Sequence, residues 1–173
     1  KLLKQKSNPV VLIGYDCRFG GEMFANRCSE VFGYHGIKVY LPLSFASTPM
    51  VSFGTTRLKA DLGVVITASH NPPIYNGYKI KGPYGGPASE QMTKEVELLI
   101  PEHPPVDILT SEYYKKKGLI HDIDLEEMYM KQIEGSFDLN AIRNSGLKLG
   151  YDAMFGAGQG AMKKILPDIH SLH

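Results

Sequence analysis

Short apolar runs alternate along the chain with stretches whose apolar residues recur at helical spacing. The runs over 10–14, 37–43 and 62–67 are bounded by glycine or polar residues, as strands buried on both faces of a parallel sheet are. Helical spacing occupies 20–36 and 47–60. This alternation predicts an α/β fold, whose crossovers imply a parallel core sheet.

Two of the predicted helices carry end signals. Gly36 stands where a left-handed glycine would end the first helix. The second begins near Thr48, which can cap a helix, and has Pro49 in its first turn. The apolar face expected for the first helix consists of Met23, Phe24, Cys28, Val31 and Phe32.

The second half of the chain changes character twice. An amphipathic helix is predicted over 90–100, and the stretch 101–123 is rich in proline and charge, which is typical of a connector. Asp124 and Glu127 then form a capping pair that opens a further helix. A strand, a glycine-rich turn and a helix start follow over 147–166, so we predict the opening of a second α/β unit there.

Composition excludes several classes of function. The formal net charge is +1, with 43% hydrophobic and 21% charged residues, so we expect no nucleic-acid partner and no membrane partner. No apolar run approaches the roughly 20 residues that span a bilayer. Cys17 and Cys28 are too few for a disulfide framework and lack metal-ligand spacing, which favours reduced thiols and a cytoplasmic protein.

A serine lies where a ligand site would form in such a fold. Ligands of open parallel sheets bind beyond the carboxyl ends of the strands. Ser69 and His70 follow the predicted strand over 62–67, and Asp16 and Arg18 follow the first strand. We therefore expect these four side chains to face one crevice.

The residue types around Ser69 favour phosphoryl transfer over acyl transfer. Acyl-transfer serines of one large class sit in a GxSxG elbow, which this sequence lacks. Phosphoryl transfer needs an oxygen that carries the phosphoryl group, cations that neutralise phosphate oxygens, and a general acid/base. Ser69 can supply the first, Arg18 and Lys79 the second, and Lys79 or His70 the third.

A turn signal places Lys79 near this loop. Asn76 and Gly77 predict a tight turn, which we interpret as a type I′ hairpin. The turn would bring residues 78–81 back past the loop, with Lys79 and Lys81 on one face by alternation. A structural interpretation stays open, because serine in such a loop is often only a turn residue.

Several segments together carry a resemblance to a known family. TASHNPP at 67–73, NGYK at 76–79 and KGPYGG at 81–86 resemble the phosphoserine loop of the α-D-phosphohexomutases, the phosphoglucomutases and phosphomannomutases. Three further segments resemble the family's first active-site strand and helix, the stretch before the phosphoserine strand, and the start of its second domain: GYDCRFGGEMFA, STPMVSF and YDAMFGAGQG.

The resemblance implies a phosphohexomutase chemistry. The serine that matches Ser69 gives a phosphoryl group to a hexose phosphate, forming a bisphosphate, and then takes back the other one. Phosphate thereby moves between C1 and C6 of glucose and/or mannose. Lys79 matches the general acid/base, His70 a residue that orients the transfer, and Arg18 an arginine that binds phosphate near the phosphoserine. Hexose 1,6-bisphosphate is the activating intermediate. The family's Mg²⁺ is held by one phosphoserine oxygen, here on Ser69, and by three aspartates of a DxDxD-like loop.

The resemblance also implies a division into domains. It predicts a three-layer αβα sandwich with a mixed, mainly parallel sheet over 1–123, truncated at its N-terminus. A connecting helix over 124–145 and the truncated first strand–helix unit of a second α/β domain over 146–173 follow. The sequence contains no DxDxD loop. We therefore expect a fragment that is inactive alone, whose partners are a hexose phosphate and the missing domains II to IV of its parent chain. The alternative is a non-catalytic relative that binds a phosphosugar or a protein.

Overall fold

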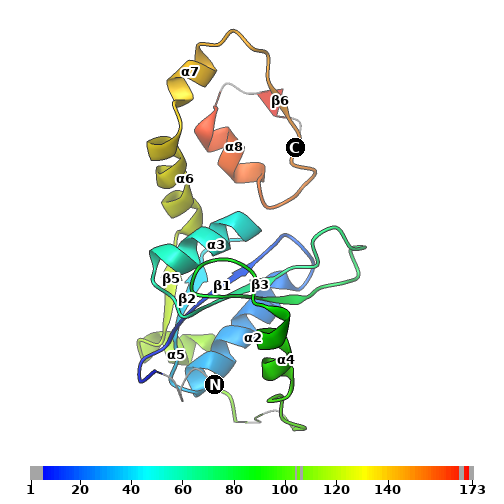
Figure 1. Ribbon diagram of the computed structural model, residues 1–173, viewed down its shortest axis with the longest axis vertical. Coiled ribbons are helices and arrows are strands. Elements are labelled where there is room, and N and C mark those ends of the chain that lie inside the picture. Colours follow the sequence, from blue (N-terminus) through cyan, green and yellow to red (C-terminus); the bar gives the residue numbers. More distant parts are fainter. Residues whose placement is uncertain (1–5, 104, 106, 168–169, 172–173) are drawn as a thin grey trace.

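A five-stranded sheet forms the centre of the computed structural model, which describes residues 6–103, 105, 107–167 and 170–171 (Figure 1). The strand order is β4-β3-β1-β2-β5; β4 runs antiparallel to β3, and the other neighbours are parallel. The predicted α/β fold with a mixed, mainly parallel sheet is therefore confirmed. The strands are β1 (Val10–Tyr15), β2 (Lys38–Pro42), β3 (Leu62–Ile66), β4 (Tyr78–Lys81) and β5 (Ile120–Ile123).

Helices cover both faces of this sheet, which confirms the three-layer sandwich. On one face Leu12 shares a core with Met50 of α3 and Leu125 of α6. On the other face Val11 shares a core with Ala25 of α2 and with α5. Neighbouring strand residues serve different cores because successive side chains point to opposite faces. The helices are α2 (Gly21–Tyr34), α3 (Thr48–Arg57), α4 (Glu90–Glu97), α5 (Ser111–Lys116), α6 (Leu125–Ser136), α7 (Leu139–Arg143) and α8 (Gln159–Ile165).

Helix α2 buries a different stripe from the one expected. Met23 and Phe24 are exposed, although Cys28 and Phe32 pack against the core. A row of small residues faces inward and lets the helix approach its neighbours closely. A Cβ at Gly33 would lie only 2.7 Å from Cγ of Tyr114 in α5. The buried row consists of Gly21, Ala25, Ser29 and Gly33.

The cap of α3 lies one residue earlier than predicted. The Ser47 side chain accepts the hydrogen bond from the Met50 N–H at 3.4 Å. Thr48 is the first helical residue, and Pro49 still lies in the first turn. The prediction of Thr48 as the cap is therefore wrong by one residue, because serine caps a helix at least as well as threonine.

The connector predicted over 101–123 is wrong in its second half, which contains α5 and β5. Strand β5 reads IHDI, and only Ile120 is fully buried in it. Its position explains the polar sequence, since it forms one edge of the sheet beside β2. Edge strands commonly carry charged residues, which hides them from a search for apolar runs.

The predicted type I′ hairpin at Asn76–Gly77 is also wrong. Neither residue has the positive φ that such a turn requires. Strands β3 and β4 do pair antiparallel, but a long loop joins them, and the Thr67 N–H donates to the Gly77 carbonyl at 3.0 Å. Glycine is needed at position 77 because the two backbone segments approach closely there. A Cβ at Gly77 would lie 2.8 Å from the carbonyl oxygen of Thr67.

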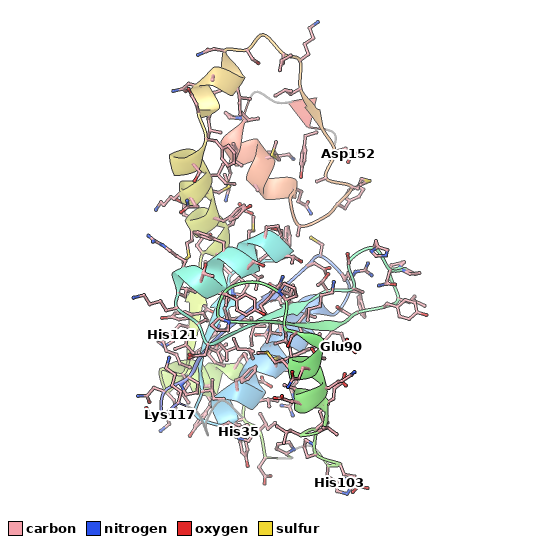
Figure 2. All side chains as sticks on the ribbon, in the orientation of Figure 1. His35, Glu90, His103, Lys117, His121 and Asp152 are labelled. Carbon is pink, nitrogen blue, oxygen red and sulfur yellow. The ribbon has the colours of Figure 1, made fainter. Side chains whose placement is uncertain are left out.

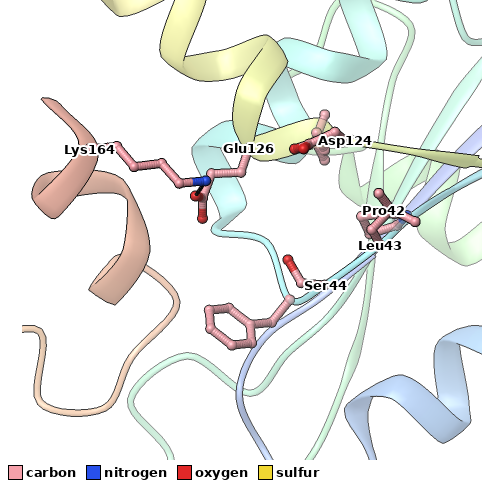
Figure 3. A pocket seen from close by; sticks show the side chains of 8 residues that line it. Pro42, Leu43, Ser44, Asp124, Glu126 and Lys164 are labelled. Carbon is pink, nitrogen blue, oxygen red and sulfur yellow. Dashed lines mark ion pairs between the residues drawn. The ribbon is translucent and has the colours of Figure 1, made fainter.

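The C-terminal segment packs on α6, on the α3 side of the sheet (Figure 1). Ile165 of α8 joins the core that contains Leu125. Lys164 of α8 pairs with Glu126 of α6 beside a cavity of about 90 Å³ (Figure 3). A separate two-stranded parallel sheet consists of β6 (Gly150–Tyr151) and β7 (His170–Ser171).

The domain boundaries after residues 123 and 145 stay predictions, and residues 1–5 and 172–173 of the expected ranges lie outside the described residues. Within the described part of the chain, the helices are all too short or too polar to cross a membrane.

We predict that Leu125 is a major source of stability. It is 1% exposed and joins α6 to the α3 face of the sheet. Leu125→Ala should lower the free energy of unfolding by about 2–5 kcal/mol, because truncation of a buried leucine leaves a cavity. Urea unfolding followed by circular dichroism measures the change.

The matched control is Leu98→Ala, since Leu98 is 86% exposed. Its effect should stay within about 0.5 kcal/mol. Equal effects of the two substitutions would contradict this account of the core.

Candidate active site

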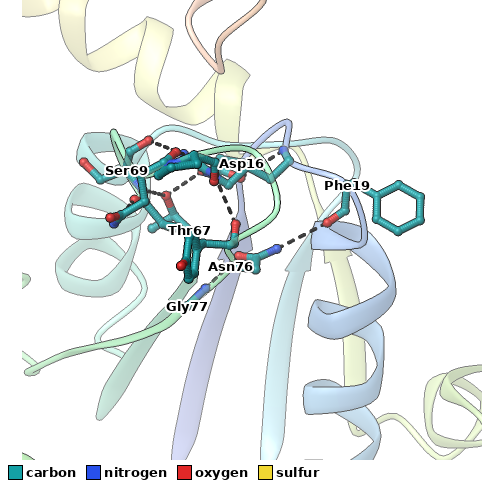
Figure 4. Close-up of polar contacts among 11 residues, drawn as sticks. Asp16, Phe19, Thr67, Ser69, Asn76 and Gly77 are labelled. Carbon is teal, nitrogen blue, oxygen red and sulfur yellow. Dashed lines mark hydrogen bonds and ion pairs between the residues drawn. The ribbon is translucent and has the colours of Figure 1, made fainter.

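The serine loop begins where two neighbouring parallel strands end. In the β1–β3 ladder Tyr15 pairs with Ile66, and the Asp16 N–H donates to the Ile66 carbonyl at 3.1 Å. The next residues, Asp16 and Thr67, therefore lie side by side at the carboxyl edge of the sheet (Figure 4). Ser69 follows two residues later, so the strand-end position expected for the site is the one observed.

Ser69 has a backbone conformation that non-glycine residues seldom adopt. Its φ is 55°, in the left-handed region, and its side chain is exposed. Its N–H donates to Oγ1 of Thr67 at 3.0 Å. The Thr67 hydroxyl in turn donates to Oδ2 of Asp16 at 2.5 Å. Non-glycine residues in the left-handed conformation cluster at functional sites. The conformation costs about 1–3 kcal/mol, which the surrounding contacts must offset.

Arg18 holds the loop from the other side. Its guanidinium donates to four backbone carbonyls of the loop, and its Nε lies 3.6 Å from Oδ2 of Asp16. Only 14% of the Arg18 side chain is exposed, so it is not a surface charge. The four carbonyls are those of Ser69 at 2.7 Å, Asn71 at 2.6 Å, Pro72 at 2.9 Å and Tyr75 at 3.1 Å.

This geometry changes the interpretation of Arg18. The sequence suggested that it binds phosphate, which would require free N–H groups. Its terminal N–H groups instead donate to the loop carbonyls. The phosphate-binding role stays a prediction, and the observed contacts of Arg18 tie together the backbone of the serine loop.

Lys79 lies on the face of the sheet that α3 covers. It pairs with Val65 in the β3–β4 ladder, and directly opposed residues share a face. Val65 belongs to the core under α3 and α6. Lys79 is exposed, whereas Lys81 on the same face is buried. His70 is also exposed, next to Ser69.

Three other histidines lie away from this site. Figure 2 shows His35, His103 and His121 far from the loop between β3 and β4. Among the described residues, no group of three or more His, Cys, Asp or Glu side chains could hold a metal ion. Asp16 is engaged with Thr67 and Arg18. The described residues therefore do not fit a Mg²⁺ site by themselves, beyond the one oxygen that a phosphorylated Ser69 would offer.

A groove that the sequence did not reveal lies on the α2 face, away from Ser69. Its volume is about 560 Å³, and its lining includes Phe24, Cys28 and Tyr78. Burial raises the pKa of the Cys28 thiol to about 11 and raises the pKa of Tyr78 as well. Tyr78 alternates with Lys79 along β4, so one short strand presents an apolar face to the groove and a cationic face to the other side.

The C-terminal segment reaches the loop that follows β1. Nε2 of Gln159, the first residue of α8, lies 3.7 Å from Sγ of Cys17. Cys17 is adjacent to Arg18, so the first residue of α8 contacts the loop next to the site. The segment 146–173 was expected only to open a second unit, and nothing in its sequence indicated this contact.

We predict that Arg18→Lys loosens the serine loop. Lysine keeps the charge but lacks the planar fork that donates to several carbonyls at once. Each lost hydrogen bond to a charged group is worth about 1.5–3 kcal/mol. Amide hydrogens of Ser69, Asn71 and Tyr75 should therefore exchange roughly 10- to 100-fold faster, since about 1.4 kcal/mol corresponds to a factor of ten.

Hydrogen–deuterium exchange with mass spectrometry over residues 67–77 measures this effect. Arg27→Lys is the matched control, because Arg27 pairs only with Glu30 on the surface of α2. Unchanged exchange in the Arg18→Lys chain would refute the assignment of Arg18 to the loop.

Comparison with known proteins places this geometry in a family. The family described as "Phosphoglucomutase/phosphomannomutase, alpha/beta/alpha domain I" matches residues 1–104. A phosphoglucomutase of Staphylococcus epidermidis is 36% identical over 172 residues, which cover 95% of this chain and 30% of the relative. A phosphoglucosamine mutase of Leuconostoc mesenteroides is 33% identical, covering 95% of this chain and 35% of the relative.

A solved structure agrees with these matches. A protein of Thermus thermophilus that is named as a phosphomannomutase superposes with a TM-score of 0.85 at 34% identity, covering 98% of this chain and 38% of that protein. The chain thus spans about a third of the length of the relatives that it matches. The chain belongs to the phosphoglucomutase/phosphomannomutase family and contains its alpha/beta/alpha domain I.

Proposed function

We propose that this chain supplies the phosphoserine domain of a phosphohexomutase, which interconverts hexose 1-phosphate and hexose 6-phosphate of glucose and/or mannose. The observation that carries the proposal is the conformation of Ser69. An exposed serine in a left-handed conformation, with both neighbouring peptide groups held by Thr67 and Arg18, is more than a turn requires. The family match supports the same function.

The proposed reaction moves one phosphoryl group at a time. A hydroxyl of the hexose phosphate attacks the phosphorus on Ser69, the bond between phosphorus and Ser69 Oγ breaks, and a hexose 1,6-bisphosphate forms. The attacking hydroxyl loses a proton, and Ser69 Oγ gains one as it leaves. After the sugar reorients, Ser69 Oγ loses its proton and attacks the phosphorus of the other phosphate. The bond between that phosphorus and its sugar oxygen breaks, the sugar oxygen gains a proton, and the phosphoserine forms again.

We assign the roles from the resemblance of these residues to the family's motif, and the exposure of the side chains is compatible with them. Lys79 is exposed on the α3 face and transfers the proton between the sugar hydroxyl and Ser69. His70, adjacent to Ser69, orients the phosphoryl group. Arg18 keeps the loop in shape and contributes positive charge beside it. Positioning and charge stabilisation of this kind supply most of the catalysis in phosphoryl transfer.

The remaining requirements lie outside the described residues. When bound, Mg²⁺ would neutralise charge on the phosphoserine oxygens, but no cluster of three or more His, Cys, Asp or Glu ligands lies among the described residues. Residues that bind the sugar would come from other domains of a longer parent polypeptide. Those domains would correspond to the part of the relatives that this chain does not cover. We place the enzyme in the cytoplasm, where Cys17 and Cys28, both free, stay reduced.

We predict that turnover depends on Ser69 and Lys79. In the full-length polypeptide that carries this sequence, Ser69→Ala should abolish incorporation of phosphate from hexose 1,6-bisphosphate and most conversion of glucose 1-phosphate. Lys79→Met should lower kcat by about 10²–10⁴-fold, the usual contribution of a general acid/base. A coupled assay for glucose 6-phosphate and intact-protein mass spectrometry measure both effects.

Ser7→Ala and Lys116→Met are the matched controls, since both residues are exposed and distant in sequence from the loop. The 173-residue chain alone should show no turnover under the same conditions. Full activity of the Ser69→Ala polypeptide would refute the phosphoserine role, and turnover by the 173-residue chain would refute the division of work among domains.

We predict no tight Mg²⁺ binding by the 173-residue chain. Mg²⁺ prefers near-octahedral oxygen ligands, and a phosphorylated Ser69 would supply only one. Calorimetric titration of Mg²⁺ into the chain, with and without phosphate on Ser69, measures the affinity. Stoichiometric submicromolar binding in either form would show that the chain holds ligands that this account lacks.

A further inference from the structure

Both peptide groups that flank the Cα of Ser69 are held by side chains. On one side its N–H donates to Oγ1 of Thr67 at 3.0 Å. On the other side its carbonyl accepts from the Arg18 guanidinium at 2.7 Å. Fixing both peptide planes fixes φ and ψ, and with them the direction in which the Ser69 side chain leaves the backbone.

Asp16 contacts both of these supports. Its Oδ2 accepts the Thr67 hydroxyl at 2.5 Å and lies 3.6 Å from Nε of Arg18. Its Oδ1 accepts a hydrogen bond from the backbone N–H of Arg18 at 3.0 Å. The carboxylate therefore links the residue that holds the Ser69 N–H to the residue that holds the Ser69 carbonyl (Figure 4).

Asp16 matters because it sets the direction in which the Thr67 hydroxyl points. A hydroxyl has a single hydrogen, and an ionised carboxylate can only accept. The Thr67 hydrogen must therefore point at Asp16, which turns a lone pair of the same oxygen toward the Ser69 N–H. Thr67 is 4% exposed, so little water competes for this arrangement. The distance of 2.5 Å is typical of a charge-assisted hydrogen bond.

We propose that Asp16 and Thr67 are positioning residues for phosphoryl transfer, which act by holding Ser69 in its left-handed conformation. The proposal rests on the proposed function of Ser69 as the phosphoryl carrier. In this proposal neither side chain needs to touch the phosphoryl group. Their work is to keep the serine oxygen where an attacking sugar hydroxyl can meet the phosphorus in line, since small misplacements cost large factors in rate.

Two substitutions of Thr67 distinguish the effect of its hydroxyl from the effect of its size. Thr67→Val keeps the shape but removes the hydroxyl, and Thr67→Ser restores it. Asp16→Asn keeps the shape of Asp16 but removes its charge. Thr55→Val is the matched control, because Thr55 is also buried and its hydroxyl donates within α3 to the Val51 carbonyl.

In the full-length polypeptide, Thr67→Val should lower kcat by roughly 10²-fold with little change in KM, because the substrate still binds but the serine is misplaced. Asp16→Asn should act in the same direction. Thr67→Ser should recover most of the rate, and Thr55→Val should leave kcat unchanged. A merely structural role for Thr67 would lower the amount of folded protein without lowering kcat per folded molecule.

A second measurement does not depend on turnover. In the ¹⁵N-labelled 173-residue chain, nuclear magnetic resonance should show faster exchange of the Ser69 amide hydrogen in Thr67→Val than in Thr67→Ser or Thr55→Val. If Thr67→Val does not fold, Asp16→Asn carries the same test. Unchanged kcat and unchanged Ser69 exchange in both substitutions would overturn the proposal.

Ser69→Ala distinguishes this failure from that of the proposed function. If Ser69→Ala abolishes turnover while Thr67→Val and Asp16→Asn do not lower it, only the positioning role is wrong. If Ser69→Ala keeps full turnover, the phosphoryl carrier lies elsewhere, and the positioning role fails with it.

Discussion

The carboxylate of Asp16 is the point on which the geometry of the serine loop depends. It accepts from the Thr67 hydroxyl and the Arg18 N–H, and it lies beside the Arg18 guanidinium. These contacts exist because β1 and β3 are parallel neighbours that end together, with Tyr15 opposite Ile66. A shift of one residue in that register would turn the Asp16 side chain to the other face of the sheet. The buried sheet therefore sets the register, and the register sets the site.

The loop itself explains why an arginine is needed beside it. Pro72 and Pro73 have no N–H groups, so the loop offers more backbone acceptors than donors. Arg18 brings donors in a planar fork and satisfies four of the carbonyls. The same contacts give the loop a positive charge whose position is fixed. A lysine would place a similar charge there but could not hold the carbonyls together.

Sequence patterns predicted the strands that are buried on both faces. Strands β1, β2 and β3 are apolar because helices cover both of their faces, and their runs were visible. Strand β5 was missed because an edge strand needs little apolar surface. The stripe of α2 was misplaced because close packing selects small residues such as Gly33, which carry no apolar signal.

Motif spacing located Ser69 and its neighbours but not how they are held. The roles of Thr67 and Asp16 depend on a contact between two strand ends 51 residues apart in sequence, which neither local spacing nor composition reports. The contacts of Arg18 were missed for a related reason. An arginine near a serine motif suggests phosphate binding, which stays a prediction. The backbone carbonyls that accept its hydrogen bonds are seen only in three dimensions.

The proposed phosphoryl transfer would have two requirements, fixed placement of the serine and exclusion of water. The described residues meet the first through Asp16, Thr67 and Arg18. They do not meet the second, because Ser69 and Lys79 are exposed. Exclusion of water strengthens electrostatic interactions in a site and prevents loss of the phosphoryl group to hydrolysis. For the proposed reaction, a loop that is held by hydrogen bonds but open to solvent would suit a site that closes when the sugar binds, because the serine would already be in place when water leaves. The C-terminal segment already lies on the face that carries Lys79 and touches Cys17 beside Arg18, so any cover over the site would approach from that side.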